Sequence, residues 1–121
     1  MTITQGDCGA LLFRLDSSGT NLYMFRVCQD GTSALFLYKN NNGSTLIPSH
    51  SNIAIHAGLN QSNLVAVVAQ GNSLNLYMNQ QKVDSISDST YSRGHIAIVA
   101  DGYPNKHPTE VVYRNARVWK L

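Results

Sequence analysis

Hydrophobic and polar side chains alternate along most of this 121-residue chain. Alternation with a period of two is typical of a β-strand that buries one face. Turn sequences rich in Gly, Asn and Asp separate the alternating runs. The pattern predicts strands at residues 9–15, 22–28, 34–38, 64–70, 73–78, 82–87, 95–100 and 110–119. Residues 47–63 do not alternate, and we expect them to form mainly a crossing loop between sheets.

Short strands at this spacing, with no convincing helix, predict an antiparallel β-sandwich or barrel. In the segment 64–87, Gly71-Asn72 and Asn79-Gln80 are expected to be two-residue turns. That register divides the side chains between two faces. The core face is predicted to hold Val65, Val67, Ala69, Leu74, Leu76, Met78 and Val83, and the polar face Asn75, Tyr77, Lys82 and Asp84.

The strands 9–15 and 22–28 are expected to pair across the turn Asp-Ser-Ser-Gly-Thr. One face of this hairpin is apolar, while the other carries Arg14 and Arg26 among Ala10, Leu12 and Met24. Arginines on a sheet face bind carboxylates or sugar hydroxyls through paired hydrogen bonds. The alternative is that each arginine is solvated and shields apolar neighbours with its stem.

The same registers predict which side chains fill the core. We expect near-complete burial of Phe13, Phe25, Val67, Leu76, Ile96, Ile98 and Val112.

The two cysteines, Cys8 and Cys28, are expected to face each other. In a hairpin centred on Ser18, the numbers of opposed residues sum to 36, which pairs these two positions. Directly opposed residues are close enough for a disulfide. Two reduced cysteines, as expected in cytosol, are the alternative.

Length and composition indicate one domain, residues 1–121, with little charge on its surface. Charged residues make up 13% of the chain, against about 25% in ordinary globular proteins. Uncharged polar surfaces favour an extracellular or cell-surface location, although no signal peptide is visible. A net charge of +2 argues against nucleic acid as a partner, and the lack of a long apolar run argues against a membrane.

Catalytic and metal-binding patterns are weak. Glycoside hydrolysis needs two carboxylates, yet Glu110 is the single glutamate, and the aspartates mostly fall in turn sequences. The histidines lack zinc-site spacing. We therefore expect no catalytic residues, no metal and no cofactor, with calcium in the loop 101–110 as the alternative.

The residues Leu76-Tyr77-Met78-Asn79, Gly94-His95-Ile96 and Val112-Tyr113…Asn115…Val118 resemble the final strands of the concanavalin A-like lectin/glucanase jelly roll. The bacterial laminin-G-like and keto-disaccharide-hydrolase-like relatives are the most similar members. The resemblance covers essentially the whole chain and implies an all-β, antiparallel two-sheet jelly-roll sandwich. Two departures stand out: Gln80 occupies a position where glycine is usual, and the family's first strands are missing. Open edges left by missing strands predict a homo-oligomer.

These observations lead to a non-catalytic binding module, with carbohydrate recognition as the first hypothesis. The expected site is a shallow polar sheet face containing some of Arg14, Arg26, Asn75, Tyr77 and His95. The alternative is a structural or self-assembly module whose open edges pair with other chains. A degenerate glycosidase-like enzyme is the third reading.

Overall fold

The computed structural model describes residues 1–102 and 107–121. The described residues form strands and no helix. In chain order the strands are β1 Thr2–Gln5, β2 Cys8–Leu15, β3 Leu22–Cys28, β4 Thr32–Lys39, β5 Asn42–Ser51, β6 Val65–Gln70, β7 Ser73–Met78, β8 Gln81–Ser87, β9 His95–Asp101 and β10 Glu110–Val112.

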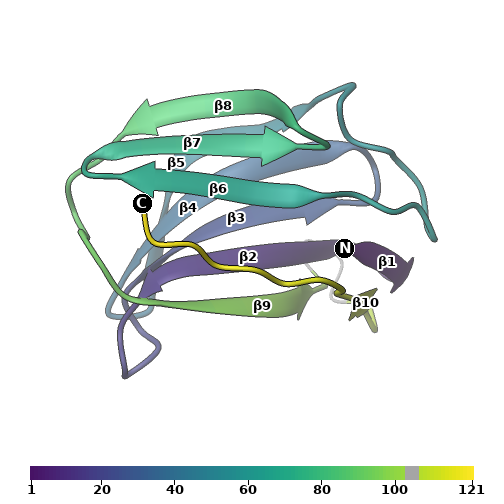
Figure 1. The fold of residues 1–121 in the computed structure, drawn as a ribbon. Helices are drawn as coiled ribbons and strands as arrows, with labels where there is room; N and C mark the ends of the chain where they lie inside the picture. The colour runs from purple at the N-terminus through teal and green to yellow at the C-terminus, as the bar shows by residue number, and fades with distance from the viewer. Residues whose placement is uncertain (103–106) are drawn as a thin grey trace.

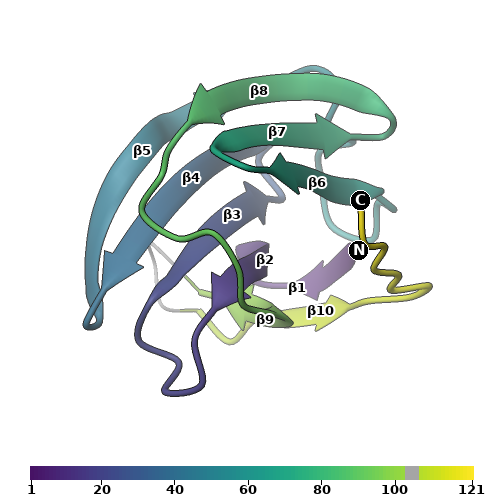
Figure 2. The same cartoon turned by 60° about the vertical axis from the view of Figure 1, so that its left-hand side comes forward.

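Three antiparallel sheets build a β-sandwich (Figure 1). One layer is a five-stranded sheet in the order β5-β4-β3-β2-β9, and the sheet β6-β7-β8 packs over it. Figure 2 shows how the larger sheet bends around the interior. The two-stranded sheet β1-β10 covers one end of β2, where Met1 and Val111 lie against Gly9.

The main core lies between the two layers, as the alternation predicts. Aromatic and aliphatic side chains from β2, β3 and β4 meet those of β7. The buried members of this cluster are Phe13, Tyr23, Phe25, Val27, Leu35, Leu37, Ala54, Ile55, Leu74, Leu76 and Met78. A smaller apolar cluster on the outer face of the five-stranded sheet contains Ala10, Leu22 and Met24.

Two strands were not predicted. Thr2–Gln5 forms β1, and Asn42–Ser51 forms β5, so residues 47–51 are strand and not crossing loop. The β5 sequence lacks the alternation of a half-buried strand because most of its side chains face solvent. Pro48 and two register shifts against β4 further obscure its pattern. At the other end of the chain, β10 covers only Glu110–Val112 of the predicted strand 110–119.

The predicted core is correct in part. Phe13, Phe25 and Leu76 are buried, while Val67 is half-buried and packs against the core. Ile96, Ile98 and Val112 were wrongly predicted, because they are 46%, 45% and 37% exposed. The two isoleucines lie on the edge strand β9. In β10 the inward-facing side chain is that of Val111, which contacts Gly9, and Val112 faces outward.

The 64–87 segment has both predicted turns, with Gln70 opposite Ser73 and Met78 opposite Gln81. Asn79 and Gln80 have φ angles of 52° and 69°, which is the left-handed conformation of a type I′ turn. One detail differs, because a bulge between Leu76 and Tyr77 places Asp84 opposite Leu76. Asp84 therefore leaves the predicted polar face, and its Oδ2 lies 2.8 Å from His50 Nε2 on β5.

The predicted disulfide is confirmed. Cys8 and Cys28 are opposed in the β2–β3 register, with their Cα atoms 4.0 Å apart, and their sulfurs are bonded. Each pair in this hairpin, from Cys8–Cys28 to Phe13–Tyr23, has residue numbers that sum to 36. The turn chemistry and the aromatic pattern together determine this register.

A buried asparagine organises the loop that follows β5. Asn63 is 5% exposed, and its side chain accepts a hydrogen bond from the His56 amide and donates one to the His56 carbonyl. Asn79 donates to Asn63 Oδ1 and to the Ala54 carbonyl, while its own Oδ1 accepts from the Leu64 amide. These bonds connect the loop to the β7–β8 turn.

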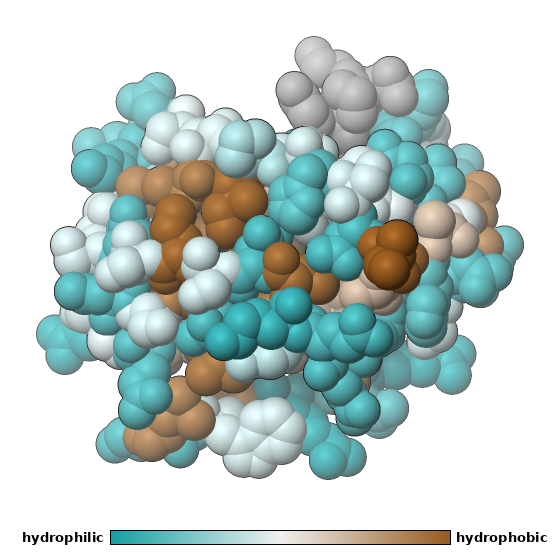
Figure 3. All heavy atoms as spheres, turned by 90° about the horizontal axis from the view of Figure 1, so that it is seen from above, coloured by the Kyte–Doolittle hydropathy of each residue, from teal (hydrophilic) through white to brown (hydrophobic). Residues whose placement is uncertain are grey.

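The surface mixes apolar patches with polar side chains, as the view from above the sandwich shows (Figure 3). Several large apolar residues are exposed, namely Ile53, Leu59, Leu64, Val68, Ile96, Ile98, Val112, Val118, Trp119 and Leu121. Within the described part of the chain, no helix has the length and apolar character needed to cross a membrane.

Candidate functional site

Arg14 does not lie on an open face. It has a φ angle of 50° at an irregularity where β2 shifts register against β9 between Leu12 and Leu15. The side chain is 9% exposed in total, and its Nη1 donates a hydrogen bond to the Tyr91 carbonyl at 2.9 Å. This geometry gives Arg14 a structural role in holding the segment before β9.

The other predicted site residues lie on different surfaces. Asn75 and Tyr77 belong to β7 in the smaller sheet, and Asn75 hydrogen bonds to Ser73 and Ser85. His95 is exposed at the start of β9. Arg26 lies on the larger sheet, where its nearest cross-strand partners are Ala10 and Ala34. The structure therefore does not bring the five residues together.

Arg26 lines the floor of a hollow on the outer face of the five-stranded sheet, where the residue is 8% exposed. Its guanidinium carbon is 4.6 Å from the centroid of the Phe36 ring, a cation–π contact. Its Nη1 lies 3.9 Å from Asp101 Oδ2 on β9. Arg26 is thus oriented by an aromatic face and a carboxylate from two different strands.

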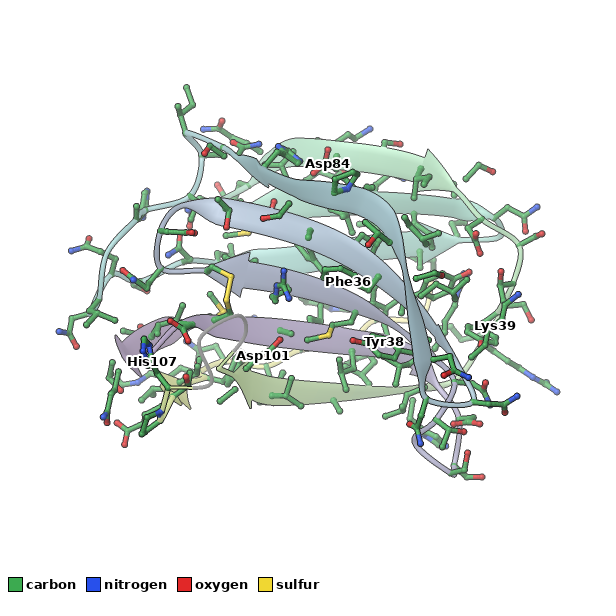
Figure 4. The ribbon with its side chains drawn as sticks, turned by 180° about the vertical axis from the view of Figure 1, so that it is seen from behind. Phe36, Tyr38, Lys39, Asp84, Asp101 and His107 are labelled. Atoms are coloured by element: carbon green, nitrogen blue, oxygen red, sulfur yellow. A yellow bond between two sulfur atoms is a disulfide. The ribbon has the colours of Figure 1, made fainter. Side chains whose placement is uncertain are left out.

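Figure 4 shows this face of the molecule, with Phe36 and Tyr38 on β4 and Asp101 on β9. Two adjoining shallow depressions share Arg26, Phe36 and Thr45, and their volumes are about 350 and 280 Å³. Side-chain hydroxyl groups line both depressions, and each depression has one aspartate. The remaining lining residues are Cys28, Asp30, Thr32 and Ser49 in the first depression, and Tyr38, Gly43, Ser44 and Asp101 in the second.

Tyr38 provides an aromatic surface in the second depression. It is directly opposite Gly43 in the β4–β5 register, and a Cβ on Gly43 would lie 2.9 Å from a ring carbon. The ring therefore packs on the glycine backbone. The Tyr38 carbonyl accepts a hydrogen bond of 2.6 Å from the Tyr91 hydroxyl, which anchors this end of β4.

The chemistry of the hollow suits a neutral, hydroxyl-rich molecule. A tyrosine ring packs against the C–H face of a sugar, while guanidinium and carboxylate groups donate to and accept from its hydroxyls. Positive charge from Arg26 is balanced by Asp101 and Asp30, so the surface does not select strongly for an anion.

Glu110 is exposed, and its Oε1 accepts a hydrogen bond from Thr4 Oγ1 at 2.7 Å. No group of three or more His, Cys, Asp or Glu side chains within residues 1–102 and 107–121 is arranged to hold a metal ion. The alternative calcium loop, 101–110, includes residues 103–106, which lie outside the described residues.

Sequence reasoning did not place Phe36, Tyr38, Thr45 or Asp101 on the binding face, although Asp101 begins the loop considered for calcium. A signal for the first two was present, since Phe36 and Tyr38 alternate with Leu35 and Leu37 along β4. Leu35 and Leu37 point into the core, so Phe36 and Tyr38 lie on the outer face of the sheet. Two aromatic side chains on an outer face indicate a surface that binds a ligand. Thr45 and Asp101 carry no local signal, because strand pairing alone brings them beside Arg26.

The chain matches no protein-family model, and no curated protein sequence matches it. Among solved structures, it is similar to the carbohydrate-binding module CBM66 from Bacillus subtilis, with a TM-score of 0.69 and 25% sequence identity. The similarity covers 80% of this chain and 60% of the CBM66 chain, so it spans less than two-thirds of that chain's length. By structure, the chain is an all-β sandwich similar to a carbohydrate-binding module.

Proposed function

We propose that this protein is a non-catalytic carbohydrate-binding module and that the Arg26 hollow is its binding site. The observation that carries this proposal is the arrangement of Arg26, Phe36, Tyr38 and Asp101 on one outer sheet face. Similarity to a carbohydrate-binding module supports it independently. Arg26 is the one residue retained from the site predicted by sequence.

The two aromatic residues have different roles in this proposal. The face of Phe36 is occupied by the Arg26 guanidinium, so Phe36 positions that cation. Tyr38 supplies the ring on which a sugar packs. Arg26 and Thr45 border both depressions. The Arg26 guanidinium donates to hydroxyl groups at the edge of the sugar, and the Thr45 hydroxyl donates to or accepts from them.

We also propose a fold family and a location for this protein. We assign the sandwich to the concanavalin A-like jelly rolls, on the strand sequences described above. An extracellular or cell-surface location fits the disulfide between Cys8 and Cys28, because disulfides persist in oxidising compartments.

A glycan array with the whole chain tests the proposal. We expect binding to one class of neutral glycan, competed by the free sugar, and a loss of at least tenfold in affinity for Tyr38→Ala and for Thr45→Ala. The matched control is Tyr77→Ala, which removes an aromatic ring from the smaller sheet and should leave affinity unchanged. Absence of any glycan binding, or a loss confined to the Tyr77 variant, would contradict the proposed site.

A further inference from the structure

The strand β9 has one unpaired edge. It pairs with β2 on one side, and within the described residues no strand pairs with its other side. An unpaired edge exposes backbone donors and acceptors that can bind another strand, and proteins usually protect such edges with Pro, Lys, charges or bulges. The central residues of β9, Ile96 to Ala100, contain none of these devices.

Two other edges of the sandwich are better protected. β5 contains Pro48 and two register shifts, and β8 contains Lys82, Asp84 and a bulge. His50 and Asp84 further connect these two edges through a contact of 2.8 Å. β6 is also an edge strand, and its residues Val65–Gln70 include neither Pro nor a charged side chain. Of these two unprotected edges among the described residues, β9 is the one that begins with a histidine and ends with an aspartate.

Apolar side chains accompany this open edge. Ile96 and Ile98 are 46% and 45% exposed, although Ile98 is opposite Leu11, on the face of β2 that points toward the core. An exposed strand edge accompanied by apolar side chains is a template for pairing with another chain.

We propose that β9 pairs with β9 of a second copy of this chain, antiparallel, about a twofold axis at Ile98. In this register the numbers of opposed residues sum to 196. Ile98 faces its own counterpart, Ile96 faces Ala100, and Ala97 faces Val99. The apolar side chains of one copy therefore cover those of the other.

The polar residues at the strand ends fit the same register. His95 at the start of β9 is opposite Asp101 at the end of the partner's β9, and the twofold axis repeats this pair. A parallel arrangement in register would instead place Asp101 of one copy beside Asp101 of the other. Like charges directly opposite each other disfavour strand pairing, whereas a histidine beside a carboxylate can form a hydrogen bond.

The pairing joins the two five-stranded sheets into one continuous sheet. Because the Arg26 hollow lies on the outer face, the two hollows then open on the same side of the dimer. If the proposed function is correct, the dimer binds a glycan surface through two sites, which raises its apparent affinity through effective concentration. The self-association itself does not depend on glycan binding.

Cysteine crosslinking tests the register. Ile98→Cys places two thiols opposite each other at the twofold axis, and we expect a covalent dimer on a non-reducing gel after mild oxidation. The matched control is Ile96→Cys, because positions 96 of the two copies are offset by four residues, about 13 Å. Efficient crosslinking of both variants, of neither, or of Ile96→Cys alone would overturn the proposed register.

Sedimentation tests the association without new cysteines. The unmodified chain should be dimeric at tens of micromolar, and Ile98→Lys should weaken the dimer at least tenfold while near-ultraviolet circular dichroism shows an intact fold. Val68→Lys, on the outer face of β6, should leave the dimer unchanged. A monomeric unmodified chain, or a dimer lost with Val68→Lys but kept with Ile98→Lys, would reject β9 as the interface. These outcomes are independent of the glycan array.

Discussion

The ring of Tyr38 packs against the backbone of Gly43 on the neighbouring strand. A Cβ at position 43 would lie 2.9 Å from one ring carbon and 3.1 Å from another, closer than side chains normally approach. The pair sits at the edge of the hollow that also contains Arg26 and Thr45. The absence of a side chain at Gly43 therefore determines where the ring lies.

Gly43→Ala should weaken glycan binding about tenfold, because the new methyl group displaces the Tyr38 ring. The free energy of unfolding should change by less than about 1 kcal/mol, since the ring is half-exposed and can move. Isothermal titration calorimetry and chemical denaturation measure the two effects.

A double-mutant cycle supplies the control for this prediction. In the Tyr38→Ala background, Gly43→Ala should have no further effect on glycan affinity. Equal losses in both backgrounds would show that Gly43 acts independently of the ring.

The sequence predicts the local parts of the site better than the non-local parts. The register that opposes Cys8 to Cys28 follows from one turn and the aromatic pattern of two adjacent strands. By contrast, Phe36 meets Thr45 only because β5 pairs with β4, and β5 is too polar to reveal itself as a strand. Asp101 approaches Arg26 through the pairing of β2 with β9, whose paired residues are at least eighty positions apart in sequence.

Local irregularity explains the error at Arg14. Strand parity places Arg14 on an outer face, but its left-handed conformation redirects it to the Tyr91 carbonyl. The alternation of side chains correctly places Ile98 on the same face of the sheet as Leu11. Alternation does not show, however, that Ile98 remains 45% exposed on that face. That residues 1–121 form a single domain stays a prediction.

Reducing the Cys8–Cys28 bond should lower the free energy of unfolding by about 3 kcal/mol. The bond closes a loop with a sequence separation of 20, and crosslinking restricts the unfolded chain accordingly. Denaturation with and without reductant measures the difference. A variant with both cysteines changed to alanine should not respond to reductant, and thiol titration of the unfolded, unreduced protein should find no free thiol. A reductant-insensitive unmodified protein would show that the bond contributes nothing.

Tyr113 should make stability depend on alkaline pH. Its hydroxyl donates to the Val99 carbonyl at 2.6 Å and accepts from the Ala10 amide at 3.0 Å, which ties the C-terminal segment to β2 and β9. Burial raises the pKa of Tyr113 to about 12. The neutral phenol is therefore favoured in the folded state, so its stabilisation is complete below the ordinary pKa near 10 and is lost as the pH rises through 12.

Tyr113→Phe tests this role. The variant should be less stable by about 2 kcal/mol at neutral pH, because it leaves the Val99 carbonyl without its phenol donor. Its stability should also fall less than that of the unmodified protein between pH 10 and 12. Tyr77→Phe is the control and should change neither quantity. Identical alkaline profiles for the Tyr113 variant and the unmodified protein would contradict the assignment.

Gln80→Gly should stabilise the protein by roughly 0.5–1 kcal/mol. Gln80 is exposed and has a φ angle of 69°, a conformation that costs a residue with a side chain about 1–2 kcal/mol but costs glycine almost nothing. The gain is smaller than this strain because glycine also makes the unfolded chain more flexible.

The next residue, Gln81, is exposed too but begins β8 in an extended conformation, so Gln81→Gly should instead destabilise by roughly 0.5–1 kcal/mol. Urea denaturation of both variants compares them directly, and a loss of stability for Gln80→Gly would mean that its side chain supplies more than the turn strain costs.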